Sequence, residues 1–179
     1  VYKRQQNTQP ISTQADPVAS SSGQAMTPEQ LYAANVDACV GITVSTTMTN
    51  IFGYTSTSAA SGSGFVITAD GYIVTNYHVI SSVLTGGQIQ VTLADGRLYA
   101  ARVVGHDKTT DLAVIRLDNP PEDLTVARFT TSSTLQVGAP VMAIGAPLGL
   151  SNTVTTGIVS ALNRPVEVSM DEDSSSQDP

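Results

Sequence analysis

Short β-type segments separated by turn signals make up most of this chain from Val40 onward. The segments are rich in Val, Ile, Leu, Thr and Tyr, and the pairs Asp70-Gly71 and Asp95-Gly96 are strong signals for tight turns between antiparallel strands. Many short strands at close spacing, with almost no helical periodicity, predict an all-β fold of the sandwich or barrel type. We predict strands at residues 40–46, 64–69, 72–75, 89–93, 98–105, 112–117, 137–144, 153–162 and 166–170.

The N-terminal part of the chain has a different character. Residues 1–26 are rich in Gln, Ser, Thr and Pro, and predict a flexible lead-in. Thr27, Pro28 and Gln30 then carry the signature of a helix start, because a capping threonine is followed by proline in the first turn and by glutamine at the capping-box position. We expect this short helix to end near residue 37.

Three further segments lack strand character. Residues 47–61 are polar and predict a mobile surface loop, and Pro120-Pro121 marks a connector between two groups of strands. Residues 171–179 contain Asp and Glu but neither Lys nor Arg, and predict an acidic tail.

Composition limits the classes of function. With 179 residues and 41% hydrophobic content the chain can bury a sizeable core, whereas a net charge of −7 disfavours nucleic acid as its partner. Cys39 is the single cysteine, so no intramolecular disulfide forms, and its apolar surroundings indicate a small buried hydrophobe rather than a reactive thiol. No segment reaches the length of a transmembrane helix, but the chain begins with Val1 rather than Met, which leaves a missing upstream anchor or signal open.

Two residues in strand-like surroundings suggest chemistry. His78 follows the segment Gly71-Tyr-Ile-Val-Thr-Asn-Tyr, and Asp111 opens the apolar run that continues to Leu117. An imidazole can take a proton from a hydroxyl nucleophile and return it to a leaving amine, while a carboxylate holds the imidazole tautomer and stabilises the imidazolium. His78 and Asp111 are therefore predicted to be two members of a catalytic triad.

Two neighbouring residues compete with this assignment. Asp107 is the rival carboxylate, but it precedes the turn, whereas Asp111 begins the strand that would hold it rigidly. His106 is interpreted as a solvated loop residue, because no cluster of Cys, His and Asp has the spacing of metal ligands.

The ordered motifs around these residues resemble those of the trypsin-like serine proteases of the HtrA/Deg family. Residues 30–168 carry the resemblance, and its motifs are Ser61-Gly-Ser-Gly-Phe65, Asp70-Gly71-Tyr72, Thr75-Asn-Tyr-His78-Val-Ile, Val91-Thr-Leu-Ala-Asp-Gly-Arg97, Ala101–Leu117, Val137–Leu150 and Val154–Arg164. It implies an all-β, chymotrypsin-like double β-barrel with a complete first barrel and an incomplete second one. The expected divisions are a helix and first barrel over residues 27–118 and a partial second barrel over 119–170.

The nucleophile is missing from this pattern. In the family it lies in a Gly-Asn-Ser-Gly-Gly loop whose backbone N–H groups form the oxyanion hole, and no such string occurs here. Ser63 has flanking glycines but precedes His78, and the serines at 174–176 lie in the acidic tail without flanking glycines. We therefore expect the sequence to be truncated before the catalytic serine and this chain to be inactive by itself.

The resemblance also implies a setting. It implies an endopeptidase of the bacterial cell envelope, membrane-anchored or secreted, that degrades unfolded or damaged polypeptides as a homotrimer, with a PDZ domain commonly following and with no metal or organic cofactor. An alternative is a non-catalytic binding or holdase module that kept the first two triad positions by descent. An acidic structural adhesin would explain the composition but not the ordered motifs.

Overall fold

The computed structural model describes residues 26–49, 54–145 and 153–164. Its helices are α1 (Pro28–Asn35) and α2 (Tyr77–Ile80), with short 3-10 turns η1 (Val36–Ala38), η2 (Ser81–Val83) and η3 (Ser132–Thr134). Its strands are β1 (Cys39–Thr49), β2 (Thr55–Val66), β3 (Tyr72–Asn76), β4 (Gln88–Thr92), β5 (Leu98–Asp107), β6 (Leu112–Leu117), β7 (Pro140–Gly145) and β8 (Thr153–Ile158).

Strands β1 to β6 form a closed antiparallel barrel in the order β1-β2-β3-β6-β5-β4. β1 closes it by pairing with β2 along its whole length and with β4 through residues 41–45. The interior is filled with aliphatic side chains that alternate along the strands, as a half-buried sheet requires. The largest fully buried side chains are Val40, Ile42, Val44, Val66, Ile73, Ile80, Val91, Ile115 and Leu117. The predicted all-β class and the complete first barrel are confirmed.

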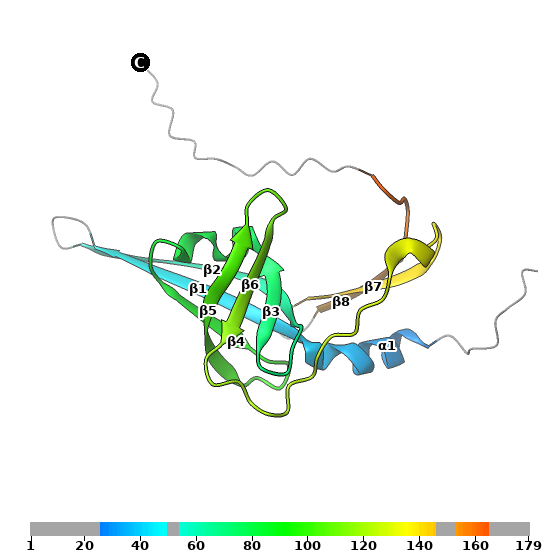
Figure 1. Cartoon of the computed structure of the whole chain (residues 1–179), viewed down its shortest axis with the longest axis horizontal. Helices are drawn as coiled ribbons and strands as arrows, with labels where there is room; N and C mark the ends of the chain where they lie inside the picture. The colour runs from blue at the N-terminus through cyan, green and yellow to red at the C-terminus, as the bar shows by residue number, and fades with distance from the viewer. Residues whose placement is uncertain (1–25, 50–53, 146–152, 165–179) are drawn as a thin grey trace, which may run out of the picture.

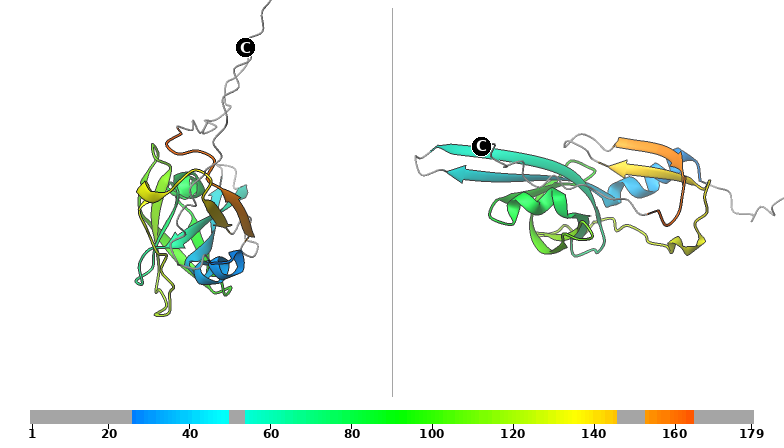
Figure 2. Two further views of the ribbon diagram at one scale, coloured as in Figure 1. Left: turned by 90° about the vertical axis from the view of Figure 1, so that its right-hand side faces the viewer. Right: turned by 90° about the horizontal axis from the view of Figure 1, so that it is seen from above.

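The predicted mobile loop at residues 47–61 is wrong. β1 continues to Thr49 and β2 begins at Thr55, and the two pair residue by residue as far as Thr49 opposite Thr55. Figures 1 and 2 show this hairpin running past the end of the barrel as a two-stranded arm. The described side chains of the arm from Thr55 to Ser61 are exposed, so the alternating apolar pattern that marks a strand is absent although Thr suits an extended backbone.

The N-terminal helix begins as predicted. Thr27 accepts a hydrogen bond from the Gln30 backbone, and the Gln30 side chain accepts one from the Thr27 backbone, so both halves of the capping box are present. The α-helix ends at Asn35 and continues through η1 into β1. In the described ranges, no helix combines the length and the apolar character needed to cross a membrane.

The connector after β6 is fastened to the barrel. The Ala127 N–H donates to the Val66 carbonyl at 2.8 Å, and the rings of Phe65 and Phe129 lie 5.8 Å apart. Arg97 donates two parallel hydrogen bonds of 3.0 Å to Asp123 and lowers the pKa of that carboxyl. The connector therefore follows the barrel wall before the chain turns into β7.

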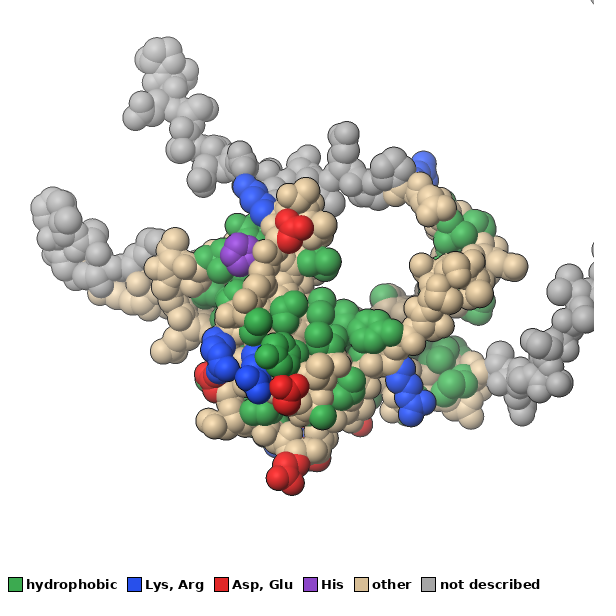
Figure 3. All heavy atoms as spheres, in the orientation of Figure 1, with side chains coloured by type: hydrophobic (Ala, Val, Ile, Leu, Met, Phe, Trp, Pro, Cys, Tyr) green, Lys and Arg blue, Asp and Glu red, His purple; other side chains and the backbone are tan. Residues whose placement is uncertain are grey.

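β7 and β8 form a separate two-stranded antiparallel sheet, which lies on the side of the barrel opposite the arm (Figure 1). β7 begins three residues later than the prediction of 137–144, at Pro140, and β8 ends at Ile158 rather than at 162. The predicted strand 166–170 lies outside the described residues. Val141, Val154 and Ile158 of the β7–β8 sheet have exposed side chains. Figure 3 also shows exposed hydrophobic side chains over the middle of the face in view and on the segment at its right.

Candidate active site

His78 is presented by α2, the short helix that follows β3. Val79 and Ile80 of the same helix are buried in the barrel core and anchor it, whereas the His78 side chain is 63% exposed. The sequence thus places an accessible imidazole on a backbone that packing holds in place.

Asp111 occupies the residue directly before β6. It has a left-handed backbone conformation, with φ of 53°, which Asp and Asn adopt more readily than most residues. The turn that leads to it is organised by Asp107, whose carboxylate accepts hydrogen bonds from the Thr109 N–H at 2.9 Å and the Thr110 hydroxyl at 3.0 Å. Asp107 therefore shapes the turn, and Asp111 is the carboxylate that reaches the histidine.

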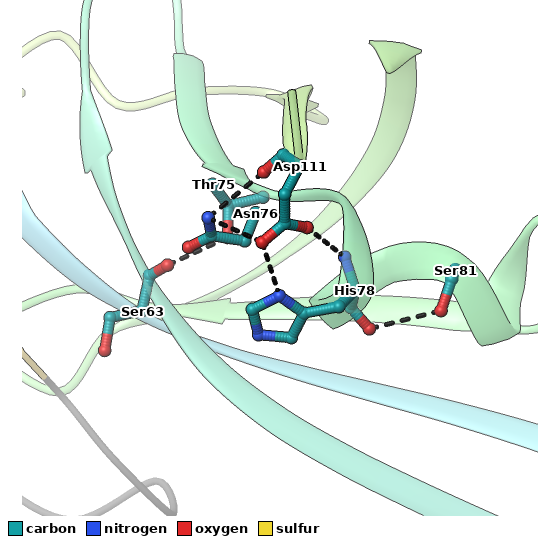
Figure 4. Close-up of polar contacts among 6 residues, drawn as sticks. All are labelled: Ser63, Thr75, Asn76, His78, Ser81 and Asp111. Atoms are coloured by element: carbon teal, nitrogen blue, oxygen red, sulfur yellow. Dashed lines mark hydrogen bonds and ion pairs between the residues drawn. The ribbon is translucent and has the colours of Figure 1, made fainter. Parts of the chain in front are cut away.

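The two predicted residues meet through two hydrogen bonds, shown in Figure 4. His78 Nδ1 lies 2.8 Å from Asp111 Oδ2, and the His78 backbone N–H donates to Oδ1 at 2.9 Å. The Asn76 side-chain amide also donates to Oδ2, at 3.2 Å. The ring edge that carries Nε2 is turned away from Asp111 (Figure 4).

The environment favours the ionised form of Asp111. Partial desolvation raises the pKa of this carboxyl, but the backbone N–H of His78, the His78 ring and the Asn76 amide lower it by more, so the pKa lies below its ordinary value. An ionised carboxylate only accepts hydrogen bonds, so His78 Nδ1 must carry a proton. In the neutral imidazole, Nε2 then carries the lone pair that a general base requires.

The other candidate residues lie elsewhere. His106 is exposed at the end of β5 rather than in a loop. Its ring centroid lies 5.3 Å from that of the Tyr77 ring. Ser63 lies on β2, where its carbonyl accepts a hydrogen bond from the Thr75 hydroxyl at 2.8 Å, and its side chain points away from the His78 ring in Figure 4. The serines at 174–176 lie outside the described residues.

Outside the His78–Asp111 pair, two other kinds of chemistry to consider among the described residues are a reactive thiol and a metal site. Burial raises the pKa of the Cys39 thiol, and its Sγ lies 3.7 Å from the Asn35 carbonyl, so it is held as a neutral thiol. Across the part of the chain that the structure describes, no three His, Cys, Asp or Glu side chains gather closely enough to hold a metal ion.

The motif-based assignment missed two residues that shape this site, Asn76 and Gly62. Asn76 belongs to the Thr-Asn-Tyr-His motif, but its partner is a residue far along the chain, so the motif alone does not reveal its role. Gly62 lies on β2 against α2, where a Cβ atom would come within 2.5 Å of Val79 Cγ2. A glycine in a strand is a signal of such close approach.

We predict that Gly62→Ala destabilises the protein by about 1–3 kcal/mol, because the added methyl must push Val79 and the start of α2 outward. Urea unfolding measures this loss. The matched control is Gly105→Ala on β5, where a Cβ atom meets no described atom within 4 Å and the free energy of unfolding should stay unchanged or rise slightly. Equal stability of the two variants would contradict the close packing of α2 on β2.

Comparison with known proteins identifies the family of the chain. The family described as "Trypsin-like peptidase domain" matches residues 62–178, well over half of the chain. The chain is 48% identical over 106 residues to the periplasmic serine endoprotease DegP of Escherichia coli, and 49% identical over 111 residues to the serine protease PepD of Mycobacterium tuberculosis. Each match covers 59% of this chain, and 22% of DegP and 24% of PepD. The chain thus spans about a quarter or less of these relatives' length.

A solved structure is similar in fold as well. The HtrA-type protease AlgW with a decapeptide superimposes with a TM-score of 0.66 at 28% identity, over 78% of this chain and 47% of that one. The mostly β architecture, with its closed barrel followed by a two-stranded sheet, is that of an HtrA protease. The chain belongs to the trypsin-like peptidase family and is an HtrA/DegP-type serine protease domain.

Proposed function

We propose that this chain supplies the general base and its orienting carboxylate to a serine endopeptidase of the HtrA/Deg type. The observation that carries the proposal is the 2.8 Å contact between His78 Nδ1 and Asp111 Oδ2, with Nε2 turned away from the carboxylate. His78 is the proposed base and Asp111 the residue that fixes its tautomer and stabilises the imidazolium. The similarity to DegP and PepD supports the same reaction class.

The proposed nucleophile is a serine that follows Pro179 in the natural protein, within a Gly-Asn-Ser-Gly-Gly loop. This loop would also present the backbone N–H groups that bind the oxyanion. The sequence supports this placement because it contains no such loop up to Pro179, while the matched segments make up only 22% of DegP and 24% of PepD. We further propose that residues 119–170 form part of the second barrel that carries the loop.

The reaction follows from these roles. The serine hydroxyl gives its proton to His78 Nε2 as its oxygen attacks the substrate carbonyl, and Asp111 stabilises the imidazolium that forms. When the peptide C–N bond breaks, Nε2–H protonates the leaving amine and an acyl-enzyme remains. Water then attacks the ester with His78 as the base, and the proton returns from Nε2 to the serine oxygen as the carboxylic acid leaves.

The proposed substrates are unfolded or damaged polypeptides, met outside the cytoplasm by a homotrimer. The decapeptide named with AlgW supports binding of a peptide, and the name of DegP places that relative in the periplasm. The net charge of −7 supports a polypeptide rather than a nucleic acid partner.

A fluorophosphonate probe, which reacts with activated serines, tests the proposal. The protein with its natural continuation should be labelled at one serine beyond Pro179, and the 179-residue chain should neither be labelled nor digest casein. Labelling of the 179-residue chain at Ser63 would overturn the assignment. A natural stop codon directly after Pro179, together with suppression of casein aggregation, would favour the binding or holdase module instead.

A further inference from the structure

Asn76 occupies a place where an asparagine normally has a different task. It is the last residue of β3 and the N-cap of α2, where an Asn side-chain oxygen usually accepts a hydrogen bond from a backbone N–H of the first turn. Within the described residues, its side chain makes no such capping bond. The first N–H groups of α2 are instead satisfied by another residue.

That residue is Asp111, reached across the β3–β6 pair. The Asp111 carbonyl accepts the N–H of Tyr77 at 3.1 Å, and its carboxylate accepts the N–H of His78 at 2.9 Å. Asn76 turns its amide toward the same residue and donates to the Asp111 carbonyl at 3.1 Å and to Oδ2 at 3.2 Å. Because both targets are acceptors, the amide nitrogen rather than its oxygen must face them.

The geometry points to Asn76 as a positioning residue that fixes both the backbone and the carboxylate of Asp111, and through them the tautomer of His78. One amide group joins the carbonyl and Oδ2 of the same residue, and so restricts the rotation of the carboxylate relative to a left-handed backbone. Oδ2 consequently stays within 2.8 Å of His78 Nδ1. This inference rests on the proposed function, and it explains how the proposed base, His78, keeps its proton on Nδ1.

Two substitutions separate this role from ordinary helix capping. Asp is as good an N-cap as Asn and has nearly the same shape, whereas Ala is a poor N-cap. If Asn76 served only as a cap or a space-filling residue, Asn76→Asp would be tolerated better than Asn76→Ala. Under our proposal Asn76→Asp disturbs the site more than Asn76→Ala does. The aspartate replaces an N–H donor by a carboxylate oxygen that faces Oδ2 of Asp111.

The first measurement needs no proteolysis. Two-bond ¹H–¹⁵N correlation spectra of the 179-residue chain report which ring nitrogen of a neutral histidine carries the proton, and His106→Gln identifies the His78 signals, since the chain has two histidines. We expect the Nδ1–H form of His78 in the wild type and a larger Nε2–H fraction in Asn76→Ala. The His78 spectrum of Asn76→Asp should differ most from that of the wild type. Asn76→Ser keeps one hydroxyl donor and should lie between the wild type and Asn76→Ala.

The second measurement uses the protein with its natural continuation and a peptide substrate. Asn76→Ala should lower kcat by about tenfold, which corresponds to one hydrogen bond to a charged group, with KM unchanged, and Asn76→Asp should lower kcat further. Wild-type His78 spectra in Asn76→Ala or Asn76→Asp, or a kcat for Asn76→Asp above that of Asn76→Ala, would overturn the proposal. If a variant fails to fold, Asn76→Ser decides in its place. Since the spectra do not depend on turnover, an inactive protein with the expected spectra would contradict the proposed function and leave the positioning role standing.

Discussion

Replacing His78 by alanine in the protein with its natural continuation is expected to lower kcat by about a million-fold, with KM little changed. The imidazole is the group in the proposed mechanism that removes the serine proton and later protonates the leaving amine. Without it the hydroxyl has no base, and the oxyanion hole and substrate binding alone supply the remaining acceleration. Steady-state hydrolysis of a fluorogenic peptide measures the loss.

Two comparisons make this result specific. His106→Ala removes the other histidine, which is exposed and contacts Tyr77 rather than Asp111, so kcat should stay within a few-fold of the wild type. Combining His78→Ala with loss of the catalytic serine should reduce kcat no further than either change alone, because the residues act as one unit. A His78→Ala enzyme with near-normal kcat would remove the basis of the proposed mechanism.

Asp111→Asn is expected to lower kcat by about ten-thousand-fold. In the described structure the groups that approach the Asp111 carboxylate are donors: the His78 N–H, the Asn76 amide and the protonated His78 Nδ1. If the new amide oxygen keeps its bond to the His78 N–H, the new NH₂ faces the Asn76 NH₂ and His78 Nδ1. Nδ1 must then become an acceptor, which moves the proton to Nε2 and blocks the base.

Asp107→Asn is the matched control for this substitution. Asp107 accepts bonds from the Thr109 N–H and the Thr110 hydroxyl in the turn before Asp111, and an amide oxygen can still accept one of them. We expect a modest loss of stability and a kcat within about tenfold of the wild type. Peptide hydrolysis and urea unfolding of both variants separate the two roles. An Asp107→Asn loss as large as that of Asp111→Asn would mean that turn geometry, rather than the carboxylate, limits the rate.

The contact between His78 and Asp111 could be predicted because each residue lies in a strong local pattern. Both His78 and Asp111 adjoin β-type runs bounded by turn signals, and their motifs occur in the order typical of one protease family. Asn76 stands in the same motif, but its role depends on a donor and two acceptors brought together by the pairing of β3 with β6. A local sequence pattern does not reveal this contact between residues that are far apart in the chain.

The errors in the predicted fold have physical causes as well. The side chains that the structure describes on the arm from Thr55 to Ser61 are all exposed, so hydrophobic alternation could not reveal strands that are held by their own backbone pairing. Conversely, residues 159–162 continue an apolar pattern after β8 but do not extend it. Apolar periodicity reports burial, and it loses its value where the strand is not buried.

The barrel that carries both His78 and Asp111 is made of consecutive strands, from Cys39 to Leu117, and closes without using any later residue. Since chains emerge from the ribosome N-terminus first, such a unit can fold during synthesis, before the segment proposed to carry the nucleophile exists. Under the proposed function, the proposed base and carboxylate would then be in place while the proposed serine is still being translated. In that order of assembly, the proposed protease could not cut itself or its neighbours before the segment with the serine had been made and had docked.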